Sequence, residues 1–92
     1  MLKVLCKCLL VLSTPFWAIA QATSVVFLNP GNSNETFWVS YAQFMHAAAR
    51  DLGLDLRVRY SERNPDTTLF QAREALQGPE RPDYLVLVNE QY

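Results

Sequence analysis

The chain has 92 residues, of which 50% are hydrophobic and 18% charged, and its 8 Lys and Arg against 9 Asp and Glu give a formal net charge of −1. This composition excludes a collagen-like or low-complexity chain and is too apolar for wholesale disorder. The only lysines are Lys3 and Lys7, so the rest of the chain is acidic and has no basic cluster to neutralise nucleic-acid phosphates. We therefore expect no nucleic-acid partner.

Residues 1–22 have the order of a secretory signal peptide. Lys3 and Lys7 provide a basic start, an apolar run follows, and two A-x-A patterns come next. A membrane anchor is the alternative, but Lys7 and a Ser-Thr-Pro segment interrupt the run of about 20 apolar residues that a spanning helix needs. We expect cleavage after Ala20 or Ala22 and a periplasmic mature protein.

The two cysteines, Cys6 and Cys8, both lie in the segment that would be removed. The mature chain would therefore have neither disulfide nor Cys-based zinc chemistry. We expect it to carry no metal and no cofactor, and to be held together by packing alone.

Three strands are predicted, at residues 24–28, 54–60 and 84–88. The first and third are continuous apolar runs, which is typical of strands buried on both faces. The second alternates apolar and charged residues, so only one of its faces can be dry. Arg57 and Arg59 lie on its polar face, which we interpret as the solvated side of a strand at the edge of the sheet.

Two helices separate these strands. The first is predicted from about Thr36 to Leu52, with Gly53 as a left-handed cap, and the second begins with Asp66 as N-cap and ends before Gly78. Apolar residues at helical spacing are expected to face the core. In the first helix these are Phe37, Tyr41, Phe44, Met45, Ala48 and Leu52, and in the second they are Leu69, Phe70, Ala72 and Leu76.

Strands that alternate with helices indicate parallel pairing through right-handed crossovers. The alternating second strand belongs at an edge, which gives strand order 2-1-3, the start of a doubly wound parallel sheet of α/β class. No helix or strand is predicted after residue 88. We therefore expect residues 23–92 to be the first part of a larger, incomplete lobe.

In such a sheet, ligands bind at the carboxyl ends of the strands. Asn29, Glu35 and Asn89 place amide and carboxylate groups there, although turn formation alone also explains the asparagines. Phe37 and Trp38 add aromatic faces. From helical spacing we expect Phe37 to face the core and Trp38 to be exposed. Carbohydrates suit this combination, because their hydroxyls need hydrogen-bond partners and their C–H faces stack on aromatic rings.

An enzyme is less well supported. The loop after the first strand contains neither G-x-G-x-x-G nor G-x-x-x-x-G-K-[ST], so nucleotide binding is not indicated. His46, the only histidine, falls on the polar side of the first helix and is interpreted as a solvated surface residue rather than a catalytic base. We expect no catalytic residues in this chain.

Several segments together resemble the type I periplasmic binding proteins, and within them the ribose- and autoinducer-binding branch that serves sugar importers. They are E-T-F-W-V (35–39), A-A-A-R-D-L-G-L (47–54), N-P-D (64–66) and P-D-Y-L-V-L-V-N (82–89). The resemblance implies a ligand held between two lobes, with both aromatics facing the cleft. It makes five residues the candidate ligand-binding set: Asn29, Glu35, Phe37, Trp38 and Asn89.

By this resemblance the chain is part of a non-enzymatic, exported solute-binding protein, monomeric when complete, which passes a sugar-like small molecule to an ABC-type membrane importer or a signalling receptor. Glu35-Thr36 and the residues after Asn89 depart from the pattern of the ribose-binding members, so ribose is not singled out. Two alternatives remain: a periplasmic ligand-sensing domain of a signalling receptor, and the N-terminal piece of a secreted α/β enzyme.

Overall fold

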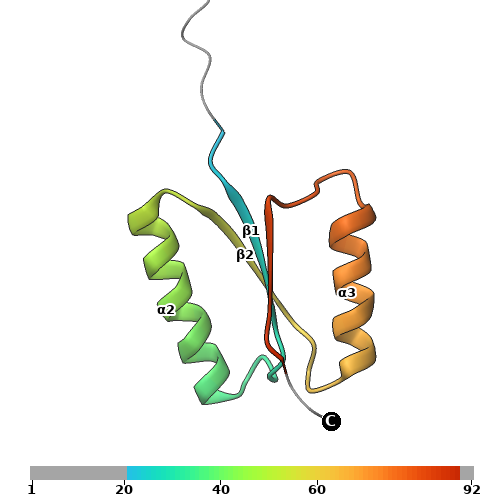
Figure 1. Cartoon of the computed structure of the whole chain (residues 1–92). Helices are drawn as coiled ribbons and strands as arrows, with labels where there is room; N and C mark the ends of the chain where they lie inside the picture. The colour runs from blue at the N-terminus through green and yellow to red at the C-terminus, as the bar shows by residue number, and fades with distance from the viewer. Residues whose placement is uncertain (1–20, 90–92) are drawn as a thin grey trace, which may run out of the picture.

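The computed structural model describes residues 21–89, which form a three-stranded parallel sheet in the order β2-β1-β3 with one helix on each face (Figure 1). The elements are β1 (Ser24–Asn29), α2 (Thr36–Leu52), β2 (Asp55–Tyr60), α3 (Pro65–Gln77) and β3 (Tyr84–Leu87). The predicted α/β class and strand order are confirmed. The expected signal peptide, apart from Gln21 and Ala22, lies outside the described residues.

β1 is the central strand and forms the core. Val25 to Asn29 are all buried, and Phe27 and Leu28 are almost fully so. β1 pairs with β2 along its whole length, from Ser24 opposite Asp55 to Asn29 opposite Tyr60. It pairs with β3 over Val25 to Leu28. Because all pairs are parallel, the carboxyl ends of the three strands meet at one edge of the sheet.

α2 packs on the sheet through small residues. Its buried side chains are Ala42 and Ala49, whereas Phe37 and Phe44 are 64% and 77% exposed. Phe37, Tyr41, Phe44 and Leu52 are all exposed, so the expectation that they are buried in the core was wrong, although the ring of Tyr41 lies 5.8 Å from that of the buried Phe27. The two alanines let the helix backbone lie close to the strands, which leaves the larger side chains outside. The left-handed end at Gly53, with φ 70°, was predicted correctly.

α3 begins two residues earlier than expected. Asn64, not Asp66, is its N-cap, and its Oδ1 accepts from the amides of Asp66 (2.9 Å) and Thr67 (3.3 Å). Pro65 explains the difference, because a residue without an N–H is well suited to the first helical position.

The apolar face of α3 is also exposed. Leu69, Phe70 and Leu76 are each about half exposed, contrary to the expected core stripe. The buried residue is Gln71, whose Nε2 donates to the carbonyl of Tyr60 at 3.0 Å and so fixes the helix to the end of β2. Within residues 21–89, no helix is both long and apolar enough to cross a membrane.

Candidate ligand-binding site

Two loops meet where β1 and β2 end, at the lower end of the sheet in Figure 1. The first, residues 30–35, leads into α2, and the second, residues 61–64, leads into α3. The amide of Ser61 donates to the carbonyl of Asn29, and the amide of Arg63 donates to the carbonyl of Pro30, both at 2.9 Å. The parallel pairing of the strands thus continues as a contact between the loops.

Asn29 connects the end of β1 to the start of α2. The residue is fully buried. Its Nδ2 donates to the carbonyl of Trp38 and its Oδ1 accepts from the amide of Gly31, both at 2.9 Å. A buried amide with both ends satisfied holds its surroundings in one geometry. In this structure Asn29 positions the loop and the helix, and its contact with a ligand stays a prediction.

The aromatic pair at the start of α2 lies the other way round from our expectation. Phe37 is largely exposed, while Trp38 is half-buried against Gly31. A Cβ at Gly31 would lie only 2.3 Å from Cγ of Trp38, so the glycine leaves the space that the indole occupies. Helical spacing could not show this, because Asn29 and Gly31 place Trp38 from outside the helix.

Tyr41, one turn further along α2, joins the two rings. The ring centroids of Phe37 and Trp38 are 5.0 Å apart at 89°, and that of Tyr41 lies 6.2 Å and 5.7 Å from them. Tyr41 also lies 5.8 Å from the buried ring of Phe27. The spacing of four residues correctly predicts that Tyr41 shares a face with Phe37, but this face is partly exposed rather than buried in the core.

Glu35 and Arg63 pair across the two loops. Oε1 of Glu35 accepts from the amide of Asn32 and from Nε of Arg63, both at 3.0 Å, and Oε2 accepts from the other arm of the guanidinium. The hydrogen bond from Arg63 is the main cause that lowers the pKa of Glu35, and the Asn32 amide adds to it. Arg63 was not among the predicted site residues, although it lies in the short loop after β2 and therefore at the same end of the sheet as Glu35.

Asn89 is exposed and follows β3 at this same edge, two residues after Leu87, which pairs with Leu28. The structure therefore brings Asn29, Glu35, Phe37 and Trp38 into one connected cluster, with Asn89 after the neighbouring strand. Glu90, Gln91 and Tyr92 lie outside the part of the chain that is described.

A solved structure of a periplasmic sugar-binding protein from Pseudomonas fluorescens matches this chain with 77% sequence identity and a TM-score of 0.72. The match confirms the resemblance to periplasmic binding proteins. It covers 76% of this chain but only 21% of that protein, so the chain spans about a fifth of its relative's length. No protein-family model matches the chain, and a search of curated proteins found no match either.

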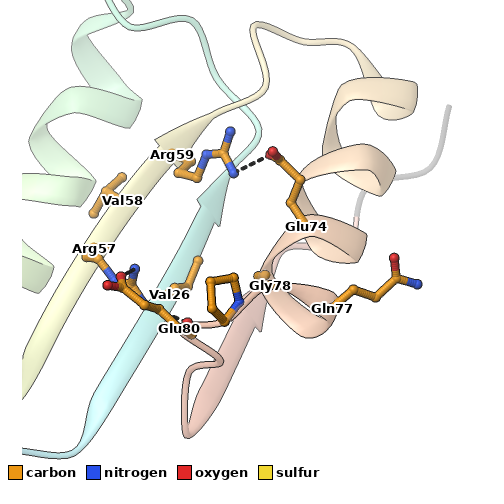
Figure 2. A pocket seen from close by; sticks show the side chains of 10 residues that line it. Val26, Arg57, Val58, Arg59, Glu74, Gln77, Gly78 and Glu80 are labelled. Atoms are coloured by element: carbon orange, nitrogen blue, oxygen red, sulfur yellow. Dashed lines mark hydrogen bonds and ion pairs between the residues drawn. The ribbon is translucent and has the colours of Figure 1, made fainter.

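A second polar region lies away from this edge, in an open hollow of about 720 Å³ between β2 and α3 (Figure 2). There Arg59 pairs with Glu74 at 2.7 Å and Arg57 pairs with Glu80 at 3.5 Å. All four side chains are substantially exposed, which confirms that this face of β2 is solvated. His46 is exposed on α2, also as expected.

Proposed function

We propose that this chain supplies one wall of the ligand site in an exported, non-enzymatic solute-binding protein for a sugar or sugar-like molecule. The observation that carries the proposal is its 77% identity, over 76% of its length, to a periplasmic sugar-binding protein. That name describes binding rather than catalysis or signalling, so neither the enzyme nor the receptor alternative is favoured.

The residues at the carboxyl ends of the strands, which we call the carboxyl edge, support a sugar as the ligand. Phe37, Trp38 and Tyr41 form a cluster whose exposed rings offer flat apolar faces to the C–H side of a pyranose or furanose. Asn89 offers an exposed amide after β3, at the same end of the sheet, and this amide can both donate to and accept from a hydroxyl. Convergent polar groups around apolar faces are typical of small-molecule sites.

The five candidate residues then divide by what the geometry allows. Phe37 is the most exposed ring and so the first expected contact, followed by Trp38 and Asn89. Glu35 lies at the ends of the strands but already binds Arg63, and the buried Asn29 holds the start of α2 in place.

The cellular setting is part of the proposal. Residues 1–22 would act as a cleaved signal peptide that directs the protein to the periplasm, and residues 23–92 would form the N-terminal part of one Rossmann-like lobe. The complete protein would be a monomer that closes over its ligand and delivers it to an ABC-type importer in the membrane. Support comes from the A-x-A patterns and from the periplasmic origin of the relative.

The test uses a chimera in which this chain's mature residues replace the matching segment of the Pseudomonas fluorescens protein. A thermal-shift screen against pentoses, hexoses and polyols, followed by calorimetry, should identify a stabilising sugar. Phe37→Ala and Trp38→Ala should each then weaken binding by about 1–3 kcal/mol, because a stacked aromatic anchor is lost.

Phe44→Ala is the matched control, because Phe44 is a 77% exposed aromatic on the same helix but lies beyond the cluster. The Phe44→Ala variant should bind the sugar with the same affinity as the parent chimera. The proposal fails if the chimera binds none of these compounds, or if all three alanine variants bind equally well.

A further inference from the structure

The turn that follows β2 has an unusual backbone. Glu62 and Arg63 are consecutive non-glycine residues with positive φ, 54° and 63°. Side chains with a Cβ are disfavoured in this left-handed region, and they remain there only where the surrounding structure holds them. Neither is glycine or asparagine, which would adopt this conformation at lower cost.

Three backbone hydrogen bonds hold the turn in this conformation. The amides of Ser61, Glu62 and Arg63 donate to the carbonyls of Asn29, Gly31 and Pro30 at 2.9, 3.1 and 2.9 Å. These hydrogen bonds attach the left-handed turn to residues 29–31. The strained turn is therefore held in place by the segment that leads to Phe37 and Trp38.

The side chains of Glu62 and Arg63 also bind the first loop, one as a hydrogen-bond acceptor and the other as a donor. The carboxylate of Glu62 accepts from the amide of Ser33 at 3.2 and 3.3 Å, and the guanidinium of Arg63 binds both carboxylate oxygens of Glu35. A bidentate guanidinium–carboxylate pair fixes orientation as well as distance. Glu35 is the N-cap position of α2, directly before the turn that carries the aromatic pair.

We infer that Arg63 is a positioning residue for the ligand site: it holds Glu35, and through it the first turn of α2, so that Phe37 and Trp38 face the site in one orientation. Glu35 then serves the ligand indirectly, by anchoring the aromatics. The effect on affinity rests on the proposed function, whereas the effect on the aromatic pair does not.

The first measurement reports on Trp38 without any ligand. Trp17 and Trp38 are the only tryptophans, so in the full chain carrying Trp17→Phe, fluorescence excited selectively at tryptophan comes from Trp38 alone. In this background Arg63→Gln should increase acrylamide quenching of the fluorescence and shift the emission to the red, and Arg63→Lys should give an intermediate change. Arg59→Gln, which removes an arginine from an ion pair outside the loops, should change neither.

Far-UV circular dichroism shows whether each variant is folded. If Arg63→Gln is not, Glu35→Gln decides, since it removes the carboxylate charge without altering the strained turn. Quenching that stays at the level of Arg59→Gln in the folded variants overturns the inference.

The second measurement uses the chimera and the sugar found for it. Arg63→Gln should weaken binding by about three- to tenfold, because the aromatic turn must then be ordered during binding, while Arg59→Gln should not. Altered fluorescence with unchanged affinity would mean that the pair stabilises the fold but does not position the ligand site. If the parent chimera binds no sugar, the proposed function fails, and the fluorescence still decides whether Arg63 orients Trp38.

Discussion

Two regions of this molecule each contain an arginine–glutamate ion pair, but the surroundings of the two pairs differ. At the carboxyl edge Arg63 binds Glu35, and in the hollow beside α3 Arg59 binds Glu74. The glutamate side chain is 28% exposed in the first pair and 46% exposed in the second. Glu80, the partner of Arg57, is 84% exposed.

The difference lies in what surrounds each pair. The Arg63 pair joins the two loops together with the backbone hydrogen bonds of the turn, and the buried amide of Asn29 fixes the first loop to the start of α2. The Arg59 pair joins a strand to a helix across a solvated hollow. Exposed ion pairs contribute little because solvent screens them, whereas a pair within a network shares the ordering cost with its neighbours.

The largest expected effect comes from breaking the cluster at its buried centre. Asn29→Ala removes both hydrogen bonds of a fully buried side chain and leaves the Gly31 amide without its acceptor. We expect the free energy of unfolding in urea to fall by about 2–3 kcal/mol. Asn34→Ala, an exposed residue of the same loop, should change it by less than about 0.5 kcal/mol, and equal losses in the two variants would contradict this account.

The pair between Glu35 and Arg63 should make stability depend on pH. Because the folded state lowers the pKa of Glu35, the resulting stabilisation is fully present above the ordinary glutamate pKa and is lost as pH falls through the lowered value. The stability difference between the wild type and Glu35→Gln should therefore be present at neutral pH and shrink in acid. In an Arg63→Gln background this pH dependence should be smaller, since the main cause of the shift is gone. A difference that stays constant with pH would show that the pair does not lower the pKa.

The smallest effect is expected in the hollow. Arg59→Gln should lower the free energy of unfolding by no more than about 1 kcal/mol, and added salt should reduce that loss, because solvent and ions already screen the pair. Arg57→Gln should cost still less, since its contact is longer and Glu80 is more exposed. A loss from Arg59→Gln that exceeds the loss from Asn29→Ala would reverse the comparison.

The candidate site was only partly predictable from the sequence. Topology alone placed Asn29, Glu35 and Asn89 at one edge, because parallel strands end together. Topology could not show that the side chain of Asn29 binds the carbonyl of Trp38, nine residues further along the chain. Nor could it show that the carboxylate of Glu35 binds Arg63, which belongs to a different loop. The relative exposure of Phe37 and Trp38 was predicted in reverse for the same reason.

The sequence by itself determined the order of elements, the parallel sheet with β1 at its centre and the left-handed end at Gly53. Hydrophobic runs, alternation and turn residues act locally, and a local pattern is enough to specify them. Tertiary structure decided which face of α2 is buried, where Trp38 lies and that Arg63 holds Glu35. Each of these depends on how closely two elements approach, and residue spacing within one element carries no information about that distance.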